Sequence, residues 1–198
     1  LTTQIAPADD FVKLFSIFHR FNNILIGLNQ DIWRYISDGW LIQANKEKFV
    51  GSSTMPQKIN PIEFENSEGN LSVANSLFEG FIRKLPMSRL QRDLSESTVL
   101  RNFGSAFGYC LIAYKSLISG VKNLGVDRFH ISASLNENFN ILLEAWQTEL
   151  RKIGDSSAYE KAARMGKNKT ISKNDWKNLT KSISNNLSSL NPENYLGL

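Results

Sequence analysis

A short segment that begins at Gly51 holds the residues of this sequence whose types and spacing best suit a chemical step. Gly51 makes the backbone pliable, and two adjacent hydroxyls follow at Ser52 and Ser53. Lys58 and Asn60 come directly before a predicted helix, and the free N–H groups of a helix start attract anions. Together they could clamp a carboxylate beside a base or nucleophile. A flexible glycine-serine connector uses the same residues, so both interpretations stay open.

A second group of polar side chains offers hydrogen-bond donors. Arg92 and Arg101 supply two guanidinium groups, and hydroxyls such as Ser97 lie between them at the predicted start of a helix. Guanidinium groups and free backbone N–H groups suit a phosphate. Taken alone, however, two arginines nine residues apart around a helix start are more often surface charges.

The elements that must position these groups are long helices. Apolar residues at helical spacing predict one helix over residues 9–37, with Asp9 or Asp10 as its N-cap. Residues 39–59 lose this periodicity and gather Gly, Ser, Lys and Asn, which predicts a long loop. Loops of this length inside a compact domain are usually functional.

A second long helix is expected directly after the loop. Asn60 suits the N-cap, Pro61 the first helical position, and Glu63 the acid of a capping box. The helix is expected to run to about Lys84, because the Leu85-Pro86 pair disfavours its continuation.

A third helix is predicted over residues 97–124, with Ser95 or Asp93 as its cap. Shorter helices are expected after it. The sequence therefore predicts an all-α fold, in which residues 1–125 form part of a long-helix bundle and residues 126–198 a small helical C-terminal domain. Helices this long are about twice the globular mean, and such a bundle often needs partner subunits.

Composition narrows the class of protein. The chain has 198 residues, of which 41% are hydrophobic and 21% charged, as in ordinary globular proteins. No apolar run approaches the length of a membrane span. The chain starts without Met and without a basic segment, so we expect its start to be a cut. The single cysteine, Cys110, lies in an apolar stretch and is expected to be buried, which fits a reducing cytoplasm.

The charge pattern does not favour a nucleic-acid partner. The net charge of +4 is spread over both halves of the chain. One basic run stands out near the C-terminus, and no aromatic residues or binding motif are interleaved to mark it as more than a solvated face. The run consists of Lys161, Arg164, Lys167, Lys169, Lys173, Lys177 and Lys181.

Residues 51–61 read Gly-Ser-Ser-Thr-Met-Pro-Gln-Lys-Ile-Asn-Pro, which resembles the signature loop of the fumarase and aspartase superfamily at every fixed position. The resemblance implies that Ser52 is the general base that removes a proton from the carbon next to a carboxylate. It also implies that Lys58 and Asn60 stabilise the dianion that forms, and that Ser53 and Ile59 contact the substrate. A serine base needs surroundings that favour its alkoxide.

Three further segments are similar to one family of this superfamily, the bacterial adenylosuccinate lyases. They are residues 2–5, 62–71 and 84–102, and the similarity reaches residue 197. The resemblance implies that the matching positions bind the substrate and that the third segment holds its AMP part. These positions are Gln4, Asn66, Arg92, Ser97, Thr98, Val99, Leu100 and Arg101.

The resemblance implies a β-elimination that splits adenylosuccinate, and its imidazole-carboxamide counterpart SAICAR, into fumarate and the amine product. It implies no cofactor, no metal, a cytoplasmic location, and a homotetramer in which several chains share each active site. His19 and His130 are expected to be structural, so the acid that protonates the leaving nitrogen is expected upstream of Leu1. The chain is then a C-terminal part that is inactive alone.

Two alternatives remain. Gln57 stands where adenylosuccinate lyases commonly have His and argininosuccinate lyases often have Gln, so argininosuccinate is a second candidate substrate. The segment from Arg92 to Asn102 opposes it. The other alternative is a non-catalytic helical protein that kept the fold for assembly. The presence of Ser52, Lys58 and Asn60 argues against that alternative.

Overall fold

The computed structural model describes residues 5–44, 60–91, 93–168, 170–181, 183 and 185–197. The described residues are helical apart from turns, connections and one two-stranded sheet, which confirms the all-α class. The chain divides into two compact units, Leu1–Val126 and Asp127–Leu198. Among the described helices, none is both long and apolar enough to cross a membrane.

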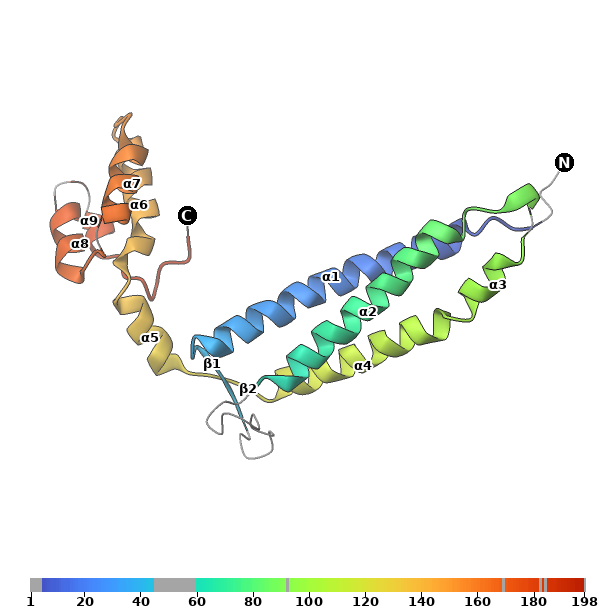
Figure 1. The fold of residues 1–198 in the computed structure, drawn as a ribbon. Coiled ribbons are helices and arrows are strands. Elements are labelled where there is room, and N and C mark those ends of the chain that lie inside the picture. The colour runs from blue at the N-terminus through green and yellow to red at the C-terminus, as the bar shows by residue number, and fades with distance from the viewer. Residues whose placement is uncertain are drawn as a thin grey trace. The chain divides into compact units, whose positions relative to one another are not determined.

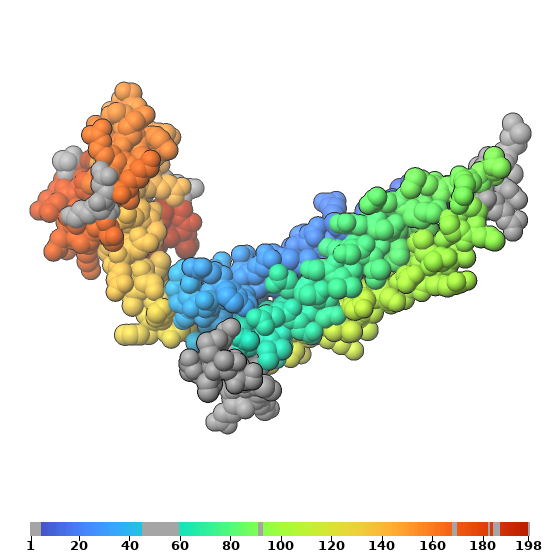
Figure 2. Space-filling view, viewed as in Figure 1, coloured from blue at the N-terminus to red at the C-terminus, as the bar shows by residue number. Residues whose placement is uncertain are grey.

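Three long helices run side by side along the first unit: α1 (Asp9–Ser37), α2 (Ile62–Lys84) and α4 (Phe103–Lys122) (Figure 1, Figure 2). Their buried faces meet in a cluster of aromatic side chains. Phe15 of α1 is fully buried, and its ring lies 5.5 Å from that of Phe78 and 4.7 Å from that of Phe103, measured between centroids. The apolar periodicity of the three helices therefore produces one shared core.

Helix α1 has the predicted bounds, but its predicted cap is wrong. Ala8 is the N-cap and makes no side-chain cap hydrogen bond, while Asp9 and Asp10 lie inside the first turn. There the two carboxylates interact favourably with the helix dipole and with Lys13. At the other end, Gly39 adopts a φ of 76° and donates its N–H to the Ile36 carbonyl. A residue without Cβ adopts this left-handed conformation most easily.

Helix α2 ends at Lys84 as predicted, but the predicted capping box at its start is wrong. The helix begins at Ile62, so Pro61 is the N-cap rather than the first helical residue, and no side-chain cap hydrogen bond forms. The Asn60 carbonyl instead accepts the Ile62 N–H over 2.9 Å. Glu63 lies in the first turn, where its charge favours the helix dipole.

The predicted third helix is in fact two helices. Helix α3 (Ser95–Leu100) begins earlier than predicted, and α4 begins only at Phe103. Arg101 and Asn102 form a turn between them. The Asn102 carboxamide donates to the Thr98 carbonyl over 2.9 Å, a side-chain bond to the backbone of the kind that competes with helix continuation.

One strand of a small antiparallel sheet lies inside the expected loop. Strand β1 (Leu41–Gln43) pairs with β2 (Leu124–Val126), and Ile42 lies opposite Gly125. The pairing ties the chain after α1 to the chain after α4. The prediction that residues 39–59 form one continuous loop is therefore wrong at residues 41–43, and residues 45–59 lie outside the described ranges.

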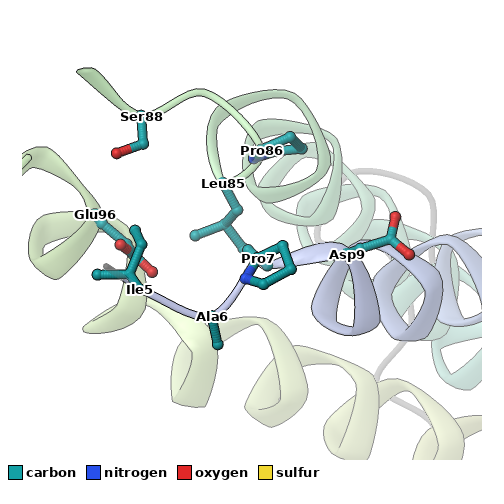
Figure 3. A pocket seen from close by; sticks show the side chains of 9 residues that line it. Ile5, Ala6, Pro7, Asp9, Leu85, Pro86, Ser88 and Glu96 are labelled. Carbon is teal, nitrogen blue, oxygen red and sulfur yellow. The ribbon is translucent and has the colours of Figure 1, made fainter. Parts of the chain in front are cut away.

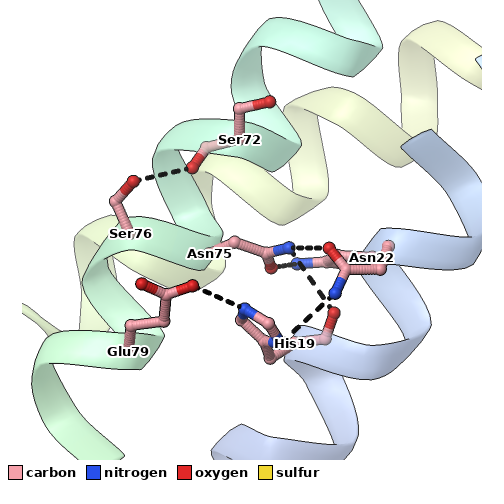
Figure 4. A network of polar contacts seen from close by, with 7 residues as sticks. His19, Asn22, Ser72, Asn75, Ser76 and Glu79 are labelled. Atoms are coloured by element: carbon pink, nitrogen blue, oxygen red, sulfur yellow. Dashed lines mark hydrogen bonds and ion pairs between the residues drawn. The ribbon is translucent and has the colours of Figure 1, made fainter.

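Polar side chains also cross the interior of the bundle (Figure 4). Asn22 of α1 donates to the Asn75 side-chain oxygen of α2 over 2.9 Å and accepts from the Tyr114 hydroxyl of α4 over 2.7 Å. Nearby, the His19 ring contacts a Glu79 carboxylate oxygen at 3.0 Å and the Asn23 carboxamide at 3.4 Å. His19 thus contacts residues of α1 and α2, in line with the structural role expected for it.

The second unit packs short helices around its own core. They are α5 (Arg128–Asn136), η3 (Phe139–Leu142), α6 (Leu143–Lys152), α7 (Ala158–Asn168), α8 (Lys173–Thr180) and α9 (Asn185–Ser188). Trp176 is the largest fully buried side chain and packs with Phe139 and Leu142. A capping box between Ser172 and Asp175 starts α8.

Candidate functional site

The predicted site residues fall into two sets. Asn60, Asn66 and the five residues 97–101 are described by the structure. The others lie outside the described residues, so their placement stays a prediction. They are Gln4, Ser52, Ser53, Lys58, Ile59 and Arg92.

Asn66 lies one turn into α2, and its carboxamide is engaged within the bundle. Its Nδ2 donates to the Ser116 hydroxyl of α4 over 2.6 Å, and its Oδ1 accepts from Asn70 over 3.0 Å. The residue is nevertheless exposed. A substrate that contacted Asn66 would therefore meet a side chain whose orientation is already fixed by two neighbours.

The predicted phosphate segment lies on α3 and the turn that follows it. Ser97, Thr98, Leu100 and Arg101 are exposed, and none of the residues of α3 is fully buried. The Ser97 hydroxyl donates to the Leu94 carbonyl over 2.8 Å, which leaves its oxygen free to accept another bond. Hydroxyls and a guanidinium group are thus presented together on an open surface, which suits an anionic ligand.

Asp93 lies two residues before Ser95, the first residue of this helix, and accepts from several donors. Its Oδ1 accepts the Ser95 N–H over 3.0 Å and the Ser95 hydroxyl, and its Oδ2 lies 3.8 Å from Lys84 Nζ and 3.6 Å from Arg89 Nε. The Ser95 hydroxyl is the largest cause that lowers the pKa of Asp93 from 3.8 to about 2. The N-cap of α3 is Leu94, which makes no side-chain cap hydrogen bond, so the prediction that Ser95 or Asp93 caps this helix is wrong. The ion pairs of Asp93 with Lys84 and Arg89 were not predicted: Arg89 and Asp93 are four residues apart, but no helix was predicted over them.

A cavity of about 280 Å³ lies beside this segment (Figure 3). Figure 3 shows the extended chain of Ile5, Ala6 and Pro7 passing close to Leu85 and Glu96. The cavity is lined by Ile5, Ala6, Pro7, Ala8, Asp9, Leu85, Pro86, Ser88 and Glu96. The structure thus brings together the chain that follows Gln4 and the chain that precedes Ser97, two segments predicted to bind the same substrate.

The end of the signature segment lies far from this cavity. Asn60 directly precedes α2, whereas Leu85 at the cavity directly follows it. A helix of 23 residues is about 35 Å long at 1.5 Å per residue. Within one chain, Asn60 and the α3 segment therefore lie at opposite ends of the bundle (Figure 1). One small substrate cannot contact both of them in a single chain.

Two family models match the chain. The model described as "Adenylosuccinate lyase C-terminal" matches residues 88–196, and the model described as "Lyase" matches residues 1–74. The first of these covers more than half of the 198 residues and includes α3 and the second unit up to residue 196.

Curated relatives named adenylosuccinate lyase give the same result. The protein of Legionella pneumophila (strain Corby) is 45% identical over 100% of this chain, and that of Escherichia coli (strain K12) is 42% identical over 99%. The protein of Buchnera aphidicola subsp. Acyrthosiphon pisum is 44% identical over 99%. The chain spans 44% of the length of each of these three relatives. The chain therefore belongs to the family described as adenylosuccinate lyase C-terminal.

Proposed function

We propose that this chain is part of a carbon-nitrogen lyase that splits adenylosuccinate into AMP and fumarate, and SAICAR into AICAR and fumarate, in purine nucleotide synthesis. The observation that carries the proposal is the exposed α3 segment. In a chain of this family, α3 presents exposed hydroxyls followed by the exposed Arg101, and its Glu96 lines a cavity that residues 5–8 also line. Such a surface suits the phosphate that both substrates carry.

The signature segment supplies the chemistry of the proposal. Ser52 removes the proton from the carbon next to a carboxylate, and Lys58 with Asn60 stabilises the resulting aci-carboxylate dianion. The electron pair then forms the C=C bond of fumarate while the C–N bond breaks. The leaving nitrogen takes a proton from an acid outside residues 1–198. The His19 ring contacts Glu79 and Asn23 within the bundle instead. No cofactor takes part in this elimination.

We further propose that the lyase is a homotetramer whose active sites combine residues of different chains. The distance between Asn60 and α3 within one chain supports this arrangement, because the two can meet at a single substrate only if they come from different copies. Residues 1–198 alone are then inactive, and the assembly works in the cytoplasm, where Cys110, the single cysteine of residues 1–198, stays reduced.

An exposed apolar stripe on α1 supports assembly. Six apolar residues recur at spacings of three or four residues, as in a helix-to-helix seam, and each is at least 41% exposed. They are Phe11, Leu14, Ile17, Phe21, Ile24 and Leu28. Contiguous exposed apolar surface of this kind marks an interaction site.

A substrate comparison tests the proposed activity. The full-length protein is assayed for fumarate release from adenylosuccinate, SAICAR and argininosuccinate at equal concentrations. The proposal expects release from the first two only. Release from argininosuccinate alone would show that the protein is an argininosuccinate lyase. No release from any of the three, together with no shift in melting temperature on addition of AMP and fumarate, would support the non-catalytic alternative.

A further inference from the structure

Asp93 connects three parts of the chain at the cavity end of the bundle. Lys84 is the last residue of α2, Arg89 opens the short helix η2 (Arg89–Gln91), and Ser95 is the first residue of α3. All three place a donor near the Asp93 carboxylate, whose side chain is only 12% exposed. Lys84 also donates to the Met87 carbonyl over 2.8 Å. The Asp93 carboxylate is thus the common partner of Lys84, Arg89 and Ser95.

The backbone inside this arrangement is strained. Leu90 has a φ of 49° and a ψ of 36°, the left-handed region that a branched side chain rarely adopts. Its side chain is 97% exposed, so packing does not hold it there. A strained residue persists only where its surroundings fix it. The contacts of Asp93 with Arg89 and Ser95 lie on both sides of Leu90 and provide that constraint.

Helix α3 depends on the contacts of Asp93 because few other contacts hold it in place. It contains six residues, of which none is fully buried and only Val99 packs against the core of the bundle. A helix of one and a half turns is not stable by itself in water. The position of Ser97 and Arg101 is therefore set by the residues that hold the first turn of α3.

We propose that Asp93 is a positioning residue for nucleotide binding, which holds α3 so that Ser97 and Arg101 meet the phosphate of the substrate. This inference rests on the proposed function, since the phosphate belongs to the proposed substrate. Asp93 does not itself bind the phosphate, because two anions repel each other. Lys84 and Arg89 offset its charge, so the carboxylate can stand beside the phosphate segment without repelling the ligand.

The first experiment substitutes Asp93 in the full-length protein. Asp93→Asn keeps the size of the side chain and removes its charge, and Asp93→Ala removes the acceptors as well. We expect KM for adenylosuccinate to rise on the order of tenfold in Asp93→Ala and less in Asp93→Asn, with kcat changed much less. The inhibition constant of AMP should rise in parallel, whereas that of adenosine, which has no phosphate, should not.

The chain contains a matched control. Asp155 accepts the Ser157 N–H over 2.9 Å and the Ser157 hydroxyl over 2.8 Å and pairs with Lys161, the same arrangement in the second unit. Asp155→Asn should lower the melting temperature to a similar degree and leave KM unchanged. An equal rise of KM in both variants would show a general loss of stability and overturn the inference.

A milder pair of variants covers the case in which Asp93 variants do not fold. Ser95→Ala removes the hydroxyl donor to Asp93, whereas Ser95→Thr keeps it. We expect Ser95→Ala to raise KM and Ser95→Thr to restore it. If the wild type releases fumarate and both Ser95 variants have its KM, the inference is wrong while the proposed function stands. A wild type that releases no fumarate from adenylosuccinate overturns both.

Discussion

The carboxamide of Asn22 donates a hydrogen bond across the bundle to the side-chain oxygen of Asn75, over 2.9 Å, with both residues buried. The same carboxamide accepts from Tyr114 and lies 3.3 Å from the Cys110 thiol. Burial raises the pKa of the Tyr114 hydroxyl, which therefore stays protonated and donates. One side chain of α1 thus satisfies polar groups of the other two long helices.

Asn22→Ala should therefore destabilise the bundle strongly. The substitution leaves the Asn75 oxygen and the Tyr114 hydroxyl without this partner, at a cost of about 1–3 kcal/mol for each orphaned group. Urea unfolding of the full-length protein at fixed concentration measures the effect. Asn23→Ala is the control, because Asn23 is exposed and gives Asn75 only one bond. Equal stability of the two variants would contradict the role assigned to Asn22.

The aromatic core gives a second prediction. Phe15 is fully buried among Phe78, Phe81 and Phe103, so Phe15→Ala should cost about 3–5 kcal/mol of unfolding free energy. Phe129→Ala is a matched control, since the Phe129 side chain is 86% exposed and its loss should change stability by less than about 0.5 kcal/mol. Thermal unfolding of both variants checks the difference. A Phe15→Ala protein with the melting temperature of the wild type would contradict this account of the core.

Asp93 also predicts how the stability of the folded protein changes at acidic pH. Its pKa is about 2 in the folded protein against an ordinary value of 3.8, so the folded state favours the ionised carboxylate. The stability that it contributes is fully present above pH 4 and is lost as the pH falls towards 2. Carboxyl chemical shifts followed by NMR should show Asp93 titrating near pH 2.

The same titration ranks the causes of the shift. Ser95→Ala should raise the pKa of Asp93 more than Lys84→Met does, because the Ser95 hydroxyl is the largest cause and the charge of Lys84 a smaller one. The reverse order would show that charge pairing rather than hydrogen bonding holds the carboxylate ionised.

The exposed stripe on α1 predicts the behaviour of the assembly. Ile24 is 70% exposed in the single chain, the most exposed residue of the stripe. Ile24→Asp would bury a charge in an interface and should dissociate the oligomer, whereas Ile24→Val should preserve it. Sedimentation of the full-length variants measures their mass. An Ile24→Asp protein that sediments as the wild-type oligomer would show that the stripe is not the interface.

The long helices were predictable because each has a strong apolar period. Helix α1 has its predicted bounds, and α2 ends where Leu85-Pro86 follows it. The break at Arg101 was not predictable in this way, because the apolar period continues through it and the bond from Asn102 to Thr98 is a local competition. The sheet was missed because its strands have three residues each, too few to show alternation.

The candidate site was predictable only in part. The exposed segment with Ser97 and Arg101 was predicted from residue types and from resemblance. The ion pairs of Asp93 with Lys84 and Arg89 were not predicted, because they depend on how the chain turns between α2 and α3. Leu90 makes that turn in a left-handed conformation that leucine disfavours. The residue type at position 90 therefore does not predict the turn.

The proposed lyase chemistry depends most on Ser52. The most direct measurement is the rate of fumarate release from adenylosuccinate by the full-length Ser52→Ala variant. Ser76→Ala is the control, because its hydroxyl only bonds the Ser72 carbonyl on the exposed side of α2. The account predicts that kcat falls by about 10²–10⁴-fold in Ser52→Ala and is unchanged in the control. Near-normal turnover by Ser52→Ala would contradict it.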